Sequence, residues 1–239
     1  MKNIKILLYL LSIILLNAAC SEEESQLYQP QLNIYSFLQG GRFYSEVFVD
    51  RSYLMDEPSS RYVDDALVLL DGGGPQDTLV LIDSLYKSYD KFIYPESTYT
   101  LTVIHPDYDT VFGTTRIPGN FQIIFPEPGD TFKISDTITI TKSTGAPYYY
   151  GYFINDNYNI PFWHTPDTSD TVIRIPMPIQ IQNLPEGYYT LQLMACDENY
   201  FEYSRFEPLQ DSLLQSGIEG GIGVFASFNL KTTSIYLSH

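Results

Sequence analysis

The sequence has 239 residues, of which 13 are lysine or arginine and 29 are aspartate or glutamate, giving a formal net charge of −16 at pH 7. A surface this acidic repels phosphate backbones, which argues against binding to nucleic acid. Hydrophobic residues make up 44% of the chain, a content that favours a packed core over a disordered chain. The length suits one large or two small domains.

The first 19 residues have the pattern of a secretion signal. Lys2 and Lys5 give a positive start, the stretch 6–16 is almost wholly apolar, and small residues lead into Cys20. The apolar stretch is shorter than the roughly 20 residues that a membrane-spanning helix needs. The exit 17–20 resembles a lipobox, and this resemblance implies cleavage before Cys20 and lipidation of that cysteine. An ordinary secreted protein with the same cleavage site, or an uncleaved anchor, is the alternative.

An acidic tether follows at residues 20–30. Removal of the signal peptide leaves 11 basic and 29 acidic side chains, a net charge of −18. The run Glu22-Glu23-Glu24 resembles the surface-export signal of Bacteroidota lipoproteins, which implies a lipid-anchored protein of the outer membrane that faces the cell exterior. The alternative is a solvated spacer.

The first half of the mature chain reads as short strands with turns between them. Val47 and Val49 are expected on one face of a strand and Phe48 on the other, and 98–104 alternates threonine with apolar residues as a half-buried strand does. Further strands are expected at 32–38, 63–70, 78–82 and 110–117. Because Gly72-Gly73-Gly74 lies between two expected strands and precedes no helix, it is interpreted as a structural turn and not as a phosphate loop.

The second half continues the same rhythm after a turn at 118–120. Expected strands are 121–125, 137–141, 148–154, 171–175, 179–181, 188–196, 224–228 and 233–237, with one helix within 201–215. The segment 160–166, which contains Trp163, is expected to be a proline-flanked loop, and 217–223 a glycine loop.

Two segments echo each other: Pro-Glu-Ser-Thr-Tyr-Thr-Leu-Thr-Val at 95–103 and Pro-Glu-Gly-Tyr-Tyr-Thr-Leu-Gln-Leu at 185–193. The prediction is an all-β protein of two tandem immunoglobulin-like or transthyretin-like β-sandwich domains. Chance similarity between two strands is the alternative explanation of the echo. The predicted organisation is a signal peptide at 1–19, a tether at 20–30, a first sandwich at 31–118 and a second at 119–239 with a short helix near 207–215.

Some of these segments resemble known families. The segments 63–70, 99–103 and 114–118 resemble a transthyretin-like or carboxypeptidase-regulatory-like sandwich. The glycine-rich segment 216–225 resembles the closing motif of a Bacteroidota outer-membrane lipoprotein family of unknown function, a domain-of-unknown-function type often encoded near TonB-dependent receptors. This resemblance implies a TonB-dependent receptor or another surface protein as partner. It implies no catalytic residue.

The residues show no catalytic constellation. His105, His164 and His239 lack metal-ligand spacing, so we expect no metal site, no cofactor and no enzymatic activity. Acidic pairs in expected turns, among them Asp64-Asp65, leave a calcium site open as an alternative. Cys196, the remaining cysteine after Cys20, lies in a strand-like run and is expected to be a buried small residue.

Aromatic residues gather in the second half of the chain. Because alternate residues of a strand face opposite sides, some of Tyr148, Tyr150 and Tyr152 are expected to face solvent if Tyr149 and Phe153 form the core, or the reverse. Together with Trp163 these three tyrosines are candidate ligand-binding residues for a glycan or a peptide. The alternative is that they simply cover the sandwich.

The sequence therefore predicts a non-enzymatic cell-surface lipoprotein that acts as an accessory or binding component of an outer-membrane uptake or assembly system. Two alternatives stay open. One is an adhesin or fimbria-like structural subunit, which would exchange strands between copies. The other is a glycan-acting enzyme whose acidic residues are dispersed in the sequence.

Overall fold

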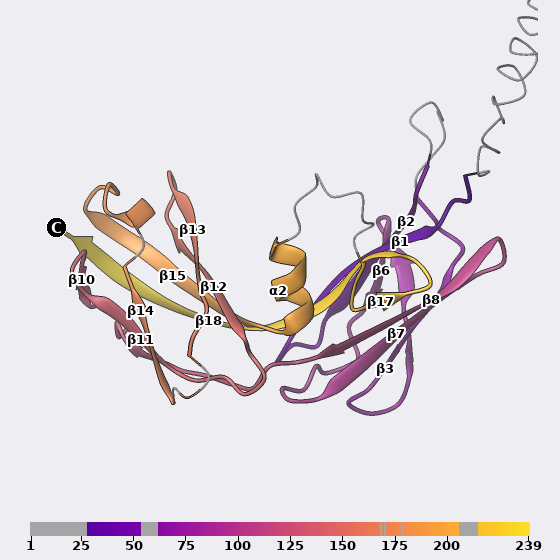
Figure 1. Ribbon diagram of the computed structural model, residues 1–239, viewed down its shortest axis with the longest axis horizontal. Coiled ribbons are helices and arrows are strands. Elements are labelled where there is room, and N and C mark those ends of the chain that lie inside the picture. The colour runs from indigo at the N-terminus through magenta and orange to yellow at the C-terminus, as the bar shows by residue number, and fades with distance from the viewer. Residues whose placement is uncertain (1–27, 54–61, 168, 170, 178, 206–214) are drawn as a thin grey trace, which may run out of the picture.

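The computed structural model describes residues 28–53, 62–167, 169, 171–177, 179–205 and 215–239. The predicted signal peptide, Cys20 and the tether up to residue 27 lie outside this part of the chain. Within it, β-strands dominate two lobes, and the helical elements are a 3₁₀ turn η1, Ile179–Ile181, and an α-helix α2, Glu198–Arg205 (Figure 1). The predicted all-β fold of two sandwich domains is confirmed.

The first lobe packs two sheets around one core. Its strands are β1 (Leu32–Gln39), β2 (Ser45–Arg51), β3 (Leu67–Asp71), β4 (Asp77–Thr78), β5 (Val80–Ile82), β6 (Leu85–Ser88), β7 (Thr98–His105), β8 (Tyr108–Arg116) and β17 (Ile218–Glu219). The strands β1, β2, β6 and β5 follow one another in one sheet, and the second sheet has the order β17-β8-β7-β3-β4. Val47 and Val49 of β2 share one face, as their alternation predicts, and this face points into the core.

The second lobe is also a sandwich of two sheets. Its strands are β9 (Ile123–Phe125), β10 (Thr131–Lys133), β11 (Thr137–Thr141), β12 (Tyr148–Ile154), β13 (Asn159–His164), β14 (Val172–Pro176) and β15 (Gly187–Cys196). One sheet begins β13-β12-β15, and the facing sheet has the order β14-β11-β9. Ile138 and Ile140 alternate with threonines in β11 and are fully buried in the core between the sheets.

One long strand connects the lobes. β18, Ile222–Ser238, pairs in parallel with β1 in the first lobe and antiparallel with β15 in the second; the short β16, Gln215–Ser216, pairs with its first residues. Figure 1 shows β18 crossing from one lobe to the other. Gly223 permits the pairing with β1, because its φ is +115° and a Cβ atom would lie 2.0 Å from the Ile34 carbonyl oxygen.

The packing of β17 and β18 modifies the predicted division at residue 118. Ile218 and Phe225 belong to the core of the first lobe, whereas Ile235 and Leu237 belong to that of the second. The first sandwich therefore needs strands from both ends of the chain. The segments 224–228 and 233–237, expected as two strands, are parts of the continuous β18.

The two echoing segments occupy matching positions. Tyr99 of β7 and Tyr189 of β15 are both buried, and each hydroxyl bonds to backbone a few residues upstream. Tyr99 accepts from the Tyr94 N–H at 2.8 Å, and Tyr189 donates to the Pro185 carbonyl at 3.0 Å. Such a tyrosine corner is a feature of immunoglobulin-like sandwiches.

Three local expectations need correction. Trp163 lies in the strand β13 and not in a loop, and 179–181 forms η1 and not a strand. The helix begins earlier than expected, at Glu198, and ends at Arg205. Of the predicted helix near 207–215, residues 207–214 lie outside the described part of the chain, and Gln215 begins β16.

Candidate functional site

β12 carries aromatic side chains on both of its faces. Tyr149 and Phe153 point into the core and are fully buried. Tyr148, Tyr150 and Tyr152 point to the opposite face, because side chains alternate along a strand. The expected exposure to solvent does not apply to Tyr148, which is buried beside Met194 and Cys196, whereas Tyr150 and Tyr152 are half-buried. Their rings contact one another: centroids are 6.3 Å apart for Tyr148 and Tyr150, and 5.0 Å apart for Tyr150 and Tyr152. This row of rings forms the floor of the candidate site.

Trp163 extends the floor from the neighbouring strand. It pairs directly with Tyr150 across the β12–β13 ladder, so both side chains lie on the same face. β13 is the edge strand of its sheet, and Trp163 is 61% exposed there. Gly151 pairs with Phe162 on the inner face, where a Cβ atom would lie 2.4 Å from the Phe162 ring. The absence of a side chain at Gly151 lets β13 pack tightly beside β12.

The helix α2 forms a wall above this floor. Asp197 caps its first turn: the Tyr200 N–H donates to Asp197 Oδ1 at 2.9 Å, and the Phe201 N–H donates to the Asp197 carbonyl at 3.1 Å. The Phe201 ring lies 5.0 Å from that of Tyr148, and the Tyr200 ring lies 6.4 Å from that of Tyr150. Figure 1 shows α2 standing over the sheet between the two lobes.

Asp197 also attaches α2 to the first lobe, through β8 in one of its sheets and β18 in the other. The Thr115 hydroxyl of β8 donates to Asp197 Oδ2 at 2.5 Å, and the Ser227 N–H of β18 donates to Oδ1 at 3.1 Å. Burial raises the pKa of the Asp197 carboxyl, and these hydrogen bonds act in the opposite direction. Asn199 adds a link, because its side-chain amide donates to the Thr114 carbonyl at 2.7 Å. The first lobe thus fixes the helix that borders the site.

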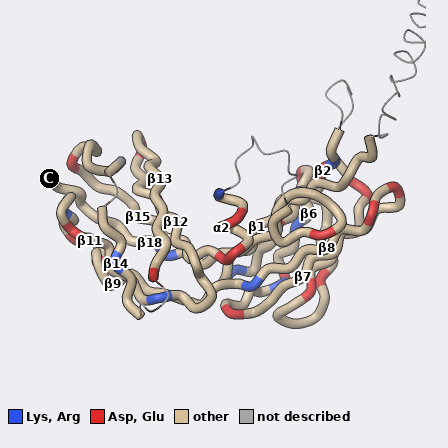
Figure 2. Tube along the Cα trace, viewed as in Figure 1, with Lys and Arg blue, Asp and Glu red and all other residues tan. Residues whose placement is uncertain are grey.

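A pocket of about 700 Å³ lies between this floor and this wall. Its lining residues are Tyr148, Tyr150, Tyr152, Trp163, Thr165, Tyr200, Phe201, Tyr203, Ser204 and Arg205. The volume and the aromatic lining are those of a small-molecule site. β12 and β13 carry no Asp, Glu, Lys or Arg, as the tan strands in Figure 2 show. Arg205 is the charged residue of the lining, and its guanidinium carbon lies 4.9 Å from the Phe201 ring centroid.

The phenols of Tyr148, Tyr152 and Tyr200 are neutral at physiological pH, because burial raises the pKa of each. Burial raises the pKa of Tyr152 to about 12, and the hydrogen bond with Tyr150 adds to this effect. Burial also raises the pKa of Tyr148 and of Tyr200. A neutral phenol both donates and accepts hydrogen bonds, so the pocket combines apolar ring faces with polar hydroxyl groups.

The four residues singled out in the sequence, Trp163 and the three tyrosines of β12, line this one pocket. The pocket also takes Tyr200, Phe201 and Tyr203 from α2, which are not among the sequence candidates. The signal that could have found them is the N-cap Asp197 followed by aromatic residues spaced three apart, which lie on one face of a helix.

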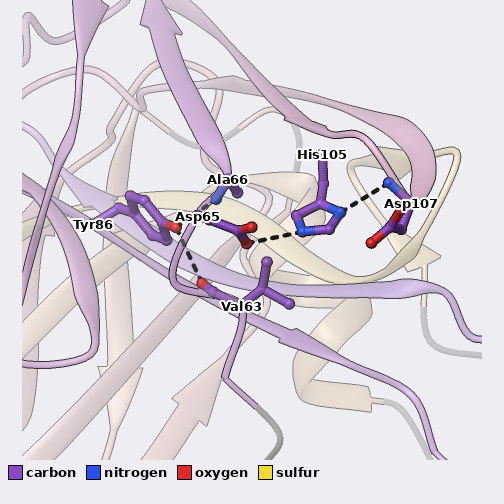
Figure 3. Close-up of polar contacts among 6 residues, drawn as sticks. All are labelled: Val63, Asp65, Ala66, Tyr86, His105 and Asp107. Carbon is purple, nitrogen blue, oxygen red and sulfur yellow. Dashed lines mark hydrogen bonds and ion pairs between the residues drawn. The ribbon is translucent and has the colours of Figure 1, made fainter.

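A second polar cluster lies in the first lobe (Figure 3). His105 Nδ1 accepts from the Asp107 N–H at 3.1 Å, and Nε2 lies 2.9 Å from Asp65 Oδ1. This geometry favours the tautomer with the proton on Nε2. Nearby, the Tyr86 hydroxyl donates to the Val63 carbonyl and accepts from the Ala66 N–H. The side chains of His105 and Tyr86 thus attach the segment 63–66 to β7 and β6, which is a structural role.

The remaining sequence candidates also have structural explanations. Cys196 is fully buried, as expected, and burial raises the pKa of its thiol. Gly72 turns the chain after β3, where a Cβ atom would lie 2.4 Å from the Thr98 carbonyl oxygen. Among the described residues, no group of three or more His, Cys, Asp or Glu could hold a metal ion. No described helix is long and apolar enough to cross a membrane.

Fold and site together define a two-sandwich β-protein with an aromatic pocket bordered by one helix. Residues 20–234 match the model of a family described as a domain of unknown function, DUF4249, and the chain belongs to this family. No curated protein matches the chain.

Solved structures resemble the chain over most of its length. The two fibronectin type-III domain segment of chicken tenascin is 9% identical, covers 70% of this chain and 91% of its own, and has a TM-score of 0.25. The N-terminal Ig1-2 module of the Drosophila receptor protein tyrosine phosphatase DLAR is 12% identical, covers 89% of this chain and 100% of its own, and has a TM-score of 0.26. The sheet order, not these alignments, defines the two sandwiches.

Proposed function

We propose that this chain is a lipid-anchored, cell-surface binding protein that serves as a non-enzymatic accessory component of an outer-membrane uptake or assembly system. The observation that carries the binding role is the aromatic pocket between β12, β13 and α2. Pockets of this size that combine aromatic walls with a few polar groups are the usual sites of small ligands.

The exposure of Trp163 supports a binding role over a covering role. A side chain that only covered the sheet would be stabilised by its own burial, yet Trp163 is 61% exposed. A large exposed aromatic ring beside half-buried tyrosines offers a surface that a ligand can desolvate. The anchoring part of the proposal is supported by the lipobox-like exit and by a family match that begins at residue 20, the predicted first residue of the mature chain.

The test is to measure binding of the purified soluble domains to arrayed oligosaccharides and peptides, with Trp163→Ala as the pocket variant. We expect the variant to lose at least about tenfold in affinity and to change the free energy of unfolding by no more than about 0.5 kcal/mol, as is usual for exposed positions. Tyr188→Ala is the matched control, because Tyr188 is 77% exposed and lies outside the pocket lining.

Two results would contradict the proposal. If Trp163→Ala and Tyr188→Ala bind every probe as well as the unaltered protein does, the pocket is not the binding site. If a bound oligosaccharide or peptide is converted to product, the protein is an enzyme. Mass spectrometry of the mature N-terminus tests the anchor, and an unmodified Cys20 there contradicts it. Recovery of a TonB-dependent receptor with the lipidated protein from intact membranes supports the accessory role.

A further inference from the structure

We infer that the aromatic pocket takes an acidic sugar residue, with its ring stacked on Trp163 and its carboxylate paired with the Arg205 guanidinium. This inference rests on the proposed function, in which the pocket binds a ligand. It adds the chemical class of that ligand, and three properties of the pocket support it.

The first property is the distribution of charge. The chain carries 29 acidic and 13 basic residues, yet among the residues that the structure describes the lining of this pocket holds Arg205 and no Asp or Glu. Glu202 lies on the same helix but outside the lining. A cationic ligand would find aromatic faces here but would be opposed by Arg205. A carboxylate would find the planar fork of donors that binds it with two hydrogen bonds.

The second property is the position of Arg205. Its guanidinium lies over the Phe201 ring, with Cζ 4.9 Å from the ring centroid. A cation held over a ring face is attracted by the ring without using its N–H groups, which stay free to donate to a ligand. Phe201 is itself held against Tyr148, with ring centroids 5.0 Å apart. The cation is therefore oriented by the aromatic wall, which favours a directed pairing over a diffuse attraction.

The third property is the match between the floor and a sugar ring. A pyranose has apolar C–H faces and hydroxyl groups at its rim, so it packs on an aromatic ring while its rim bonds to polar groups. Trp163 offers the exposed ring, and Tyr150, its partner across the ladder, offers a second ring beside it. The phenol groups and the hydroxyls of Thr165 and Ser204 supply polar partners within the same lining.

The edge strand argues against a peptide that adds to the sheet. Such a peptide would pair its backbone with β13, but Pro161 in the middle of β13 has no N–H to donate. The 3₁₀ turn η1 also contacts β13. A ligand that binds through its own ring and its carboxylate needs no ladder of backbone hydrogen bonds.

The experiment compares matched acidic and neutral probes by titration calorimetry on the folded protein. The probe pairs are trigalacturonate with its methyl ester, and sialyllactose with its methyl ester. We expect each acid to bind at least about tenfold more tightly than its neutral partner. Arg205→Gln should weaken binding of the acid about 10- to 150-fold, the range of one charge-assisted contact, and leave the neutral probe unchanged. Arg205→Lys should restore part of the loss.

Arg174→Gln is the matched control, because it removes the same charge from the exposed face of β14, outside the pocket. The inference is overturned if neutral probes bind as tightly as acids, or if Arg205→Gln behaves like Arg174→Gln. Binding of peptides alone, lost in Trp163→Ala, overturns the inference and leaves the proposed function standing. Binding of neither saccharides nor peptides overturns both. Thermal unfolding of each variant confirms that it is folded.

Discussion

Tyr149 and Tyr150 are neighbours in β12, yet they have different surroundings. Tyr149 is fully buried under the facing sheet, and its hydroxyl accepts from the Ser143 N–H at 2.7 Å. Tyr150 lies on the other face, where α2 covers the row of rings only in part, and it stays half-buried. Alternation decides which way a side chain points. Whether that side chain becomes core or site depends on the layer that a distant segment places over it.

The largest effect is expected from a comparison of one substitution on the inner face of β12 with one on its outer face. Phe153→Ala removes a fully buried ring from the second core, and we expect a loss of about 4 kcal/mol in the free energy of unfolding, because a cavity remains. Tyr152 precedes Phe153 in the strand and lies on the outer face. Tyr152→Ala should lower the free energy of unfolding by about 1 kcal/mol, because its ring is only partly buried. Urea unfolding measures both. Equal losses would mean that the two faces do not differ.

The next largest effect is expected from loosening α2, the helix that partly covers the outer face of β12. Asp197→Ala removes the N-cap of α2 and leaves the N–H groups of Tyr200 and Ser227 without their side-chain acceptor. We expect a loss of about 3 kcal/mol and weaker binding in the pocket, because the wall loses its anchor. Asp197→Asn keeps one acceptor oxygen and should lose less. If Asp197→Ala leaves binding unchanged, α2 does not shape the site.

The same carboxyl predicts a pH dependence. Burial raises the folded-state pKa of Asp197 above its ordinary value of 3.8, so the folded protein holds this proton at a pH where the unfolded chain has released it. As pH rises from about 3.8 through the raised folded pKa, the carboxyl's contribution to stability therefore falls. The advantage of the unaltered protein over Asp197→Asn should shrink over this range. A constant difference in the free energy of unfolding would contradict this.

A smaller loss of stability is expected from a substitution at Gly151, on the inner face of β12. Gly151→Ala would place a methyl group 2.4 Å from the Phe162 ring, on the core face opposite the pocket. We expect a loss of about 2 kcal/mol from this overpacking. The Phe162→Leu background should reduce the loss, since the ring atom in conflict is gone, and a double-mutant cycle measures the coupling. Additive losses would show that the two residues do not compete for space.

The local structure of the site follows from the sequence. The run Tyr148 to Ile154 predicts a strand and assigns Tyr149 and Phe153 to one face, because alternation is a property of neighbouring residues alone. The echo of 95–103 in 185–193 likewise marks the two tyrosine corners, since each forms within a few residues of chain.

Other features could not be predicted, for identifiable reasons. Prolines at 161 and 166 argued for a loop around Trp163, but an edge strand tolerates Pro161 because its missing N–H is not required there. Residues 224–228 and 233–237 are predicted as two strands, because nothing in the local sequence shows that a single strand pairs with β1 in one lobe and with β15 in the other. Glycines within 217–223 suggested a loop, whereas Gly223 permits a close approach to the Ile34 carbonyl.

The sequence by itself determined the β-rich composition, the division of the aromatic residues of β12 between two opposite faces and the signal-like N-terminus, because these depend on residue type and short-range order. Only the tertiary structure decided that α2 lies over the tyrosines and that Arg205 joins Trp163 in one pocket. Those contacts depend on the pairing of β18 with β1, almost two hundred residues away in sequence, and on Asp197 meeting Thr115 across the lobes. No local pattern encodes a partner at that separation, because the packing of whole sheets selects it.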